Sequence, residues 1–430
     1  MDSVLKGIRK SHLMMAGHIL LLAFLFLPQL AVAVPAFARQ VNMECTACHY
    51  QDYPALNSFG RAFKQQAYTF SGQENIGMDK TLSLPVTLNT SLLTKVRYQK
   101  SNGSSAETDF GELQFPDEAA LLIGGRAGEN IGFMLEFATF GAADTGSGTV
   151  TASTADTGSG EFSLFSSYKV HFNYPVNDIN VGAVVFSTDA GGAPYSFELL
   201  NTGAQRFIRA AEDRKAISAQ QFIGLGEGPA EGVALVASNA AGFVNLSMWT
   251  PDHGNVAVNG FANYLRGVLT PTIGGWDTGF GFQYFDGTAS RSAASGGDID
   301  TNGWAVDAQT QGVVGNTPVG FYLTYGQAKG AANNLFNTET NNKHAWSVMG
   351  EWGVIKDKAT LLLGYLNGDN GTDPGLGANE DRRLLFGATW LVAMNVELQL
   401  WNTRLSGNAY DPRPADGGDN VTSIMLFAGF

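Results

Sequence analysis

The two cysteines of the chain lie close together and are followed at once by a histidine, in the stretch Cys45-Thr46-Ala47-Cys48-His49. Two thiols at this spacing can each form a thioether bond to one vinyl group of a single haem, and the adjacent histidine can reach the haem iron. The sequence therefore predicts one covalently bound haem c, attached through Cys45 and Cys48, with His49 as the proximal ligand. A protein that carries this group moves electrons.

Three other roles for these residues compete with haem attachment. A structural zinc site needs four Cys or His ligands, commonly in two clusters, and the chain has no second cysteine pair. A thioredoxin-like redox pair needs a βαβ surround, whereas polar, turn-rich segments flank this motif. A plain disulfide would leave His49 without a role. An export signal favours the haem, because c-type haem is attached outside the bacterial cytoplasm.

The first residues of the chain predict a secretory signal peptide over residues 1–38. A basic region at residues 6–10 precedes the apolar run 19–27, which is too short to favour a retained membrane helix. Small-residue cleavage sites predict a cut after Ala33 or after Ala38. Either cut leaves Cys45 near the new N-terminus. We therefore expect a protein of the bacterial envelope.

The long remainder, residues 81–430, predicts an all-β fold, a transmembrane antiparallel β-barrel in the bacterial outer membrane. Beyond the signal there is no run of eighteen apolar residues, which excludes a helical membrane protein. The chain has 53 Gly, 11% aromatic and only 15% charged residues, whereas soluble domains carry about 25% charged residues. Low charge without long apolar runs suits strands with one face in lipid.

Alternating segments support the barrel, and their length predicts about 16 strands, within a range of roughly 14 to 18. Apolar and polar positions alternate in the segments 168–174, 279–284, 321–325 and 394–401. The last segment ends on Phe430, with Ile424, Leu426 and Ala428 on the same face. The alternative is a soluble β-sandwich, since alternation alone does not distinguish a lipid face from a packed core.

A barrel of this size has a lumen wide enough for an aqueous channel rather than a packed core. Residues 39–80, the predicted monohaem cytochrome c segment, are too few to bury a haem in a core of their own. We therefore expect this short helical segment to plug or line the lumen. Its residues 54–64 predict a helix that begins at a proline, with Leu56, Phe59 and Phe63 able to cover a haem face.

The same helix carries two cations. Candidates for the sixth haem ligand lie further along the chain. Arg61 and Lys64 are candidate partners of the haem propionates, although a solvated helix surface explains them equally well. Met78 and His171 are the candidates for the sixth ligand of the iron. His171 shares a face with Lys169 and Asn173 and would point into the lumen, whereas a surface position explains Met78 as simply.

The CTACH motif, together with Ala38-Arg39-Gln40 before it and the stretch 54–64 with Tyr68-Thr69 after it, resembles the N-terminal segment of the fused monohaem cytochrome–porins. The specific match covers about thirty residues, and Ala67 departs from the glycine expected before the tyrosine. The best-known members of that family are the outer-membrane cytochromes of Fe(II)-oxidising bacteria. The resemblance implies haem attachment at Cys45 and Cys48 and iron ligation by His49.

The function that this resemblance implies is extracellular electron transfer. Fe(II), or another extracellular donor, would be oxidised at the cell surface, and a periplasmic c-type cytochrome would receive single electrons, as in an Fe(II):cytochrome c oxidoreductase. A formal net charge of -13 would attract a cationic donor. The alternatives are a porin-like channel whose haem plug is a gate or sensor, and electron export to an extracellular acceptor. Outer-membrane lipid is the expected surround, and nucleic acid is not expected as a partner.

Overall fold

The protein is described by a computed structural model, which defines residues 36–51, 53–72, 75–76, 83–86, 89–104, 111–140, 165–188, 199–202, 218–225, 228–252, 259–291 and 296–430. Most of the predicted signal peptide lies outside these residues. Met78 and His253 also lie outside them. Among the described residues, no helix combines the length and the apolar character needed to cross a membrane.

Within the described residues, sixteen antiparallel strands close into a barrel, in agreement with the predicted number. The strands are β3 (Thr90–Ser101), β4 (Glu112–Gly128), β5 (Ile131–Phe140), β6 (Phe165–Val176), β7 (Ile179–Thr188), β8 (Ala230–Asn239), β9 (Gly242–Thr250), β10 (Ala262–Leu269), β12 (Trp276–Asp286), β15 (Gly303–Val314), β16 (Thr317–Ala328), β17 (Lys343–Ile355), β18 (Ala359–Asp369), β19 (Glu380–Ala393), β20 (Val396–Ser406) and β21 (Asn420–Gly429). Pairing of β21 with β3 closes the barrel, and the backbone of the terminal Phe430 pairs with that of Leu92.

Short elements complete the described chain. The N-terminal segment contains α2 (Ala36–Val41), the 3-10 turn η1 (Cys45–Ala47) and α3 (Ser58–Gln65), followed by the paired strands β1 (Asn75–Ile76) and β2 (Leu84–Pro85). The helix α5 (Ala219–Ile223) belongs to the segment between β7 and β8. The remaining elements, which belong to connections, are β11 (Thr272–Ile273), β13 (Thr288–Ala289), β14 (Ile299–Asp300), η4 (Pro374–Leu376) and η5 (Asn408–Tyr410). The predicted boundary at residue 80 thus precedes the first barrel strand, which begins at Thr90.

The outer face of the barrel is apolar, and this decides between the membrane barrel and the soluble sandwich. On β20, Leu398 and Leu400 are 41% and 47% exposed, whereas Glu397 and Gln399, which alternate with them, are buried. The predicted alternation on β6, β12 and β16 has the same sense, with aromatic and aliphatic side chains outward. A soluble sandwich would instead show polar outer side chains. A closed barrel with an apolar outer surface is the architecture of outer-membrane proteins, so the predicted fold and location are confirmed.

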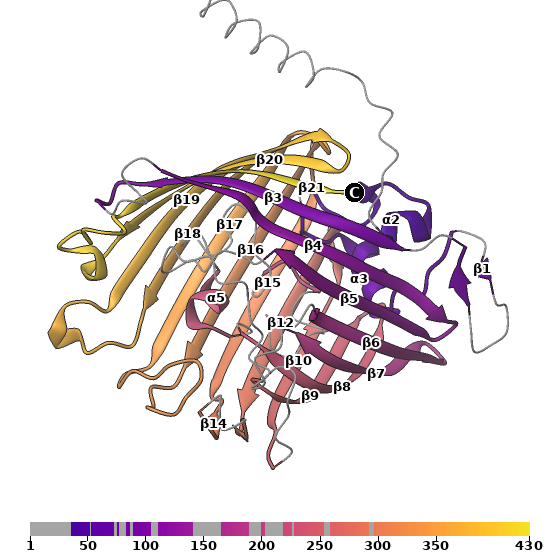
Figure 1. The fold of residues 1–430 in the computed structure, drawn as a ribbon, viewed down its shortest axis with the longest axis horizontal. Coiled ribbons are helices and arrows are strands. Elements are labelled where there is room, and N and C mark those ends of the chain that lie inside the picture. The colour runs from indigo at the N-terminus through magenta and orange to yellow at the C-terminus, as the bar shows by residue number, and fades with distance from the viewer. Residues whose placement is uncertain are drawn as a thin grey trace, which may run out of the picture.

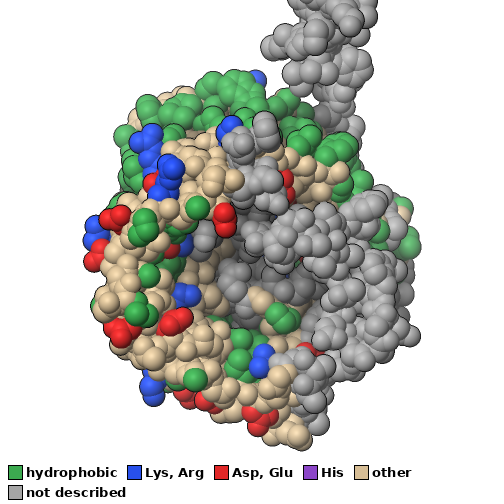
Figure 2. Space-filling model, turned by 60° about the vertical axis from the view of Figure 1, so that its left-hand side comes forward, with side chains coloured by type: hydrophobic (Ala, Val, Ile, Leu, Met, Phe, Trp, Pro, Cys, Tyr) green, Lys and Arg blue, Asp and Glu red, His purple; other side chains and the backbone are tan. Residues whose placement is uncertain are grey.

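The two ends of the barrel differ in the length of their connections. One end has tight turns, such as residues 177–178 between β6 and β7 and residues 315–316 between β15 and β16. Both α2 and α3 lie at this end, close to the chain's C-terminus (Figure 1). The other end has long connections, and Figure 2 shows a hollow there with charged side chains around its rim. Short turns face the periplasm in outer-membrane barrels, so the N-terminal segment lies at the periplasmic end.

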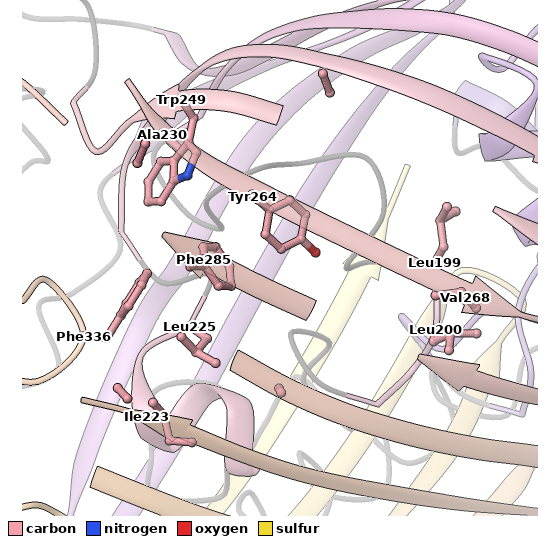
Figure 3. Packing of buried hydrophobic residues seen from close by; sticks show 14 of the residues in the cluster. Leu199, Leu200, Ile223, Leu225, Ala230, Trp249, Tyr264, Val268, Phe285 and Phe336 are labelled. Atoms are coloured by element: carbon pink, nitrogen blue, oxygen red, sulfur yellow. The ribbon is translucent and has the colours of Figure 1, made fainter. Parts of the chain in front are cut away.

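The lumen departs from the expected aqueous channel, because an apolar core fills part of it. Leu199, Leu200 and α5, all from the β7–β8 segment, pack inside the barrel against inward side chains that include Tyr264 and Phe285 (Figure 3). By contrast, the inner faces of β3, β4 and β19 carry ion pairs such as Arg97–Asp117 and Arg383–Asp381. The lumen wall thus combines an apolar core with ion pairs, and the guanidinium of Arg383 lies over the ring of the core residue Phe222.

Candidate functional site

The two cysteines occupy one tight turn. The backbone N–H groups of Cys48 and His49 both donate to the carbonyl of Cys45, at 3.1 and 3.0 Å, so His49 follows Cys45 by about one helical turn. Cys45 is buried, Cys48 is half-buried, and neither is in a disulfide. The disulfide alternative is therefore absent from this structure.

The same burial bears on the zinc alternative. It raises the pKa of both thiols, that of Cys48 to about 11, and so disfavours the thiolate form that binds metals. Within the described ranges, no group of three or more His, Cys, Asp or Glu side chains could hold a metal ion. The arrangement of the motif is that of a pair of neutral thiols beside one histidine.

His49 is oriented by a backbone carbonyl. Its Nδ1 lies 3.2 Å from the carbonyl oxygen of Ala55. A carbonyl can only accept, so Nδ1 carries the proton in this contact, and Nε2 is the nitrogen with the lone pair that a metal needs. Histidines that bind metals are held in this way by their second ring nitrogen. The residues present therefore fit a haem whose iron is bound by Nε2 of His49.

Tyr53 also fixes the histidine, and it connects the motif to the barrel wall. Its ring packs edge-on against that of His49, with centroids 4.9 Å apart. Its hydroxyl donates to the carbonyl of Met394 at 2.7 Å, in the turn between β19 and β20. Burial raises the pKa of Tyr53, so the phenol keeps the proton that it donates. The neighbouring Tyr50 makes similar bonds, to the carbonyls of Gly312 and Val319 at 2.8 and 2.9 Å.

Asn57 joins the motif to α3. Its side-chain oxygen caps the helix by accepting from the N–H of Gly60 at 3.0 Å. Its side-chain amide donates to the carbonyl of Ala47 at 3.0 Å, inside the CTACH turn. Sequence analysis gave Asn57 no role, although an asparagine before the first apolar residue of a helix is a recognisable cap signal.

The approach of α3 to the motif requires a glycine. A β-carbon on Gly60 would collide with the carbonyl oxygen of Cys48. Alanine at this position would therefore push the helix away from the CTACH turn. A second position with a backbone that suits glycine is Ala67, which adopts a φ of 56°, in the left-handed region. The glycine expected before Tyr68 would thus suit this backbone.

Two of the three predicted haem-covering side chains, Phe59 and Phe63, take part in a small aromatic core, whereas Leu56 does not. Phe63 is buried with Val41 and Tyr68, and Phe37 stacks on Tyr68 with centroids 4.7 Å apart. Phe59 lies against Phe70 at 6.0 Å. These contacts hold the N-terminal segment together, and a cover over the haem face stays a prediction.

Arg61 and Lys64, the predicted propionate partners, differ in their surroundings. One guanidinium nitrogen of Arg61, Nη2, contacts both carboxylate oxygens of Asp277 on β12, at 2.6 and 2.7 Å. Its buried Nη1 has no hydrogen-bond partner among the described residues, so one donor of Arg61 fits a propionate. Burial, and the nearby charge of Lys169, lower the pKa of Lys64. A propionate beside Lys64 would favour its charged form again.

Of the candidates for the sixth ligand, only His171 is described. It is buried on the inner face of β6, with its ring centroid 5.1 Å from that of Tyr68. It therefore lies on the side of the N-terminal segment formed by α3 and Tyr68, whereas His49 contacts Tyr53. Met78 lies outside the described residues. The identity of the sixth ligand stays a prediction.

Solved outer-membrane porins have the same fold. OprB of Pseudomonas putida gives a TM-score of 0.50 at 11% identity, over 80% of this chain and 94% of the OprB chain. A refined porin structure gives 0.48 at 14% identity, over 80% and 100%, and OmpF of Salmonella typhi gives 0.46 at 8%, over 82% and 98%. No protein-family profile and no curated protein matches the sequence. The likeness shows a porin-like barrel, and the cytochrome character stays a prediction from the motif.

Proposed function

We propose that the protein is a monohaem cytochrome–porin that carries electrons across the outer membrane. Cys45 and Cys48 would hold one haem c through thioether bonds, and Nε2 of His49 would bind its iron. The bond between Nδ1 of His49 and the carbonyl of Ala55 carries this proposal, because it presents Nε2 within one turn of both thiols. The haem supplies the one-electron chemistry of its iron.

The place of the motif in the barrel puts the proposed haem within reach of a periplasmic partner. The motif lies at the short-turn end, which faces the periplasm. Met43 and Glu44 beside Cys45 are exposed there, and a periplasmic c-type cytochrome could approach this side. An extracellular donor would enter through the lumen from the long-loop end. Each Fe(II) would lose one electron to become Fe(III), and one molecule of the periplasmic cytochrome would be reduced.

Fe(II) is the donor that the formal net charge of -13 favours. Glu351 and Glu397 are buried on the inner faces of β17 and β20. They interact electrostatically with Tyr50 and Tyr53, the two tyrosines beside the motif. A divalent cation beside these two side chains would favour the ionised form of both carboxyl groups and could bind to them. A hydrated cation would travel past the ion pairs on the inner faces of β3, β4 and β19.

A channel with a haem plug as gate or sensor is the second candidate. The observation in its favour is that the N-terminal segment lies across one end of a porin-like barrel and is held by a small set of polar contacts. Export of electrons to an extracellular acceptor uses the same residues in reverse. Conductance of the reconstituted protein would support the channel, and haem oxidation by an added extracellular acceptor would support export.

Haem attachment and reduction by Fe(II) test the proposed function together. The full chain, expressed with a c-type haem attachment system, should retain haem on a denaturing gel and show reduced-haem absorption when Fe(II) is added without oxygen. A Cys45→Ala/Cys48→Ala variant should lose covalent haem and still give a folded barrel, seen as heat-modifiable migration. Wild-type protein that retains no haem, or a haem that Fe(II) leaves oxidised at its working pH, would contradict the proposal.

A further inference from the structure

Inside the barrel, the β7–β8 segment contacts the N-terminal segment at Leu56, a few residues after the CTACH motif. Residues Leu199–Thr202 of this segment are buried, and Leu199 and Leu200 lie beside Val268 of β10 (Figure 3). The backbone N–H of Asn201 donates to the side-chain oxygen of Gln309 at 2.6 Å, and the Thr202 hydroxyl donates to Asp307. Strand β15, which carries Gln309 and Asp307, therefore anchors this part of the segment.

The side chain of Asn201 then pairs with the backbone of the N-terminal segment. Its Oδ1 accepts from the N–H of Leu56 at 2.7 Å, and its Nδ2 donates to the carbonyl of Leu56 at 2.8 Å. One amide side chain thus satisfies both backbone groups of Leu56, as a neighbouring β-strand would.

Leu56 belongs to the backbone that orients His49. The two residues form an antiparallel bridge, in which the N–H of Tyr50 donates to the carbonyl of Ala55 at 2.9 Å and that of Asn57 donates to the carbonyl of Cys48 at 3.0 Å. The backbone groups of Leu56 itself therefore point away from the motif, toward Asn201. The same Ala55 carbonyl accepts from Nδ1 of His49.

We propose that Asn201 is a positioning residue for His49. The amide of Asn201 holds the backbone of Leu56. The extended backbone of residues 55–57 then keeps the Ala55 carbonyl in place, and that carbonyl fixes the imidazole of His49. The β7–β8 segment, which packs as the apolar core of the lumen, is thereby coupled to the axial histidine. The axial role of His49 rests on the proposed function, whereas the clamp on Leu56 does not.

Hydrogen exchange in the full chain tests the clamp. In Asn201→Ala, the amide of Leu56 loses its acceptor and its carbonyl loses its donor, so exchange in the peptide that covers residues 49–57 should become about tenfold faster or more. Thr202→Val is the matched control, because it removes the neighbouring bond to Asp307 and leaves the amide of Asn201 intact. It should change the exchange of the same peptide by less than about threefold.

Haem spectroscopy of the same proteins tests the coupling to His49. We expect Asn201→Ala to shift the midpoint potential of the haem or to convert part of it to the high-spin form, and Thr202→Val to leave both unchanged. Equal exchange in wild-type and Asn201→Ala protein, or equal effects of the two variants, would overturn the clamp. Faster exchange in Asn201→Ala with an unchanged haem would overturn the coupling to His49. A wild-type chain without covalent haem would refute the proposed function, and the exchange result alone would then decide whether Asn201 clamps Leu56.

Discussion

Two segments occupy the barrel interior, and they are held there by different forces. The β7–β8 segment is part of a large apolar core, in which side chains such as Ile223, Leu225 and Phe285 are buried together. The N-terminal segment has a smaller aromatic core of its own. It meets the wall through one small apolar cluster, in which Cys45 and Tyr53 pack against Leu391, and through directional polar contacts such as Arg61–Asp277 and Tyr53–Met394. The first segment therefore contributes mainly to the stability of the barrel, and the second depends on a few bonds that set its position.

The largest expected effect comes from breaking the apolar core. Phe285 is fully buried, and its ring lies 4.6 Å from Tyr264 and 5.0 Å from Phe336. Phe285→Ala should lower the free energy of unfolding by about 3 to 5 kcal/mol, because a cavity remains. Urea titration of the protein folded in lipid vesicles measures this change.

The outward-facing Phe282 on the same strand is the matched control, since it is 42% exposed to lipid. Phe282→Ala should cost about 2 kcal/mol, because lipid refills the space and only the transfer free energy is lost. Equal losses for the two variants would show that the interior is not packed as a core. Neither substitution should reduce haem attachment.

A smaller effect is expected from breaking the ion pair between Arg61 and Asp277, which joins α3 of the N-terminal segment to β12. Arg61 is buried and the Asp277 side chain is 25% exposed, so Arg61→Ala leaves a partly buried carboxylate without a cation. The docked state of α3 should lose about 2 to 3 kcal/mol. Hydrogen exchange in the peptide that covers residues 58–66 measures the loss.

Arg61→Lys is the control for this pair, because it keeps the charge and loses the planar fork. It should fall between wild type and Arg61→Ala, and the barrel's resistance to urea should hardly change in either variant. If Arg61→Ala destabilised the barrel as much as Phe285→Ala, the two interior segments would not be held independently.

The smallest effect is expected at Tyr53. Tyr53→Phe removes the hydrogen bond to the Met394 carbonyl and keeps the ring that packs on His49. We expect a loss of about 1 kcal/mol in the docking of the motif, from one hydrogen bond, with the haem absorption spectrum unchanged. Tyr53→Leu removes the ring as well and should alter the spectrum. An altered spectrum in Tyr53→Phe would mean that the hydroxyl, rather than the ring, holds the histidine.

The sequence predicted those features that depend on local pattern. Alternation along β20 placed Leu398 outward and Glu397 inward, and the spacing of Cys45, Cys48 and His49 predicted a single compact site. These features require only the period of a strand and the length of a turn. The structure agrees with them for that reason.

The rest depends on contacts between distant parts of the chain. Tyr284 and Phe285 are consecutive aromatic residues; Tyr284 points outward and Phe285 lies in the lumen core. Alternation places one of them inward, but it does not predict that an apolar core surrounds that residue. Asn201 is separated from Leu56 by most of the first half of the barrel. A single asparagine in a long connection carries no signal of such a partner. The apolar core and the clamp on Leu56 were therefore beyond prediction.

The most direct test of electron transfer across the barrel is reduction of the proposed haem by Fe(II) supplied to one side of the membrane. In sealed outer-membrane vesicles the long-loop end faces outward, so Fe(II) added outside without oxygen reaches the short-turn end only through the lumen. If Fe(II) enters through the lumen, reduced haem should appear rapidly in wild-type vesicles. Reduction should be slower in a Glu351→Gln/Glu397→Gln variant with the same haem content. A haem that remains oxidised in intact vesicles, and is reduced only after they are opened, would contradict this route of electron transfer.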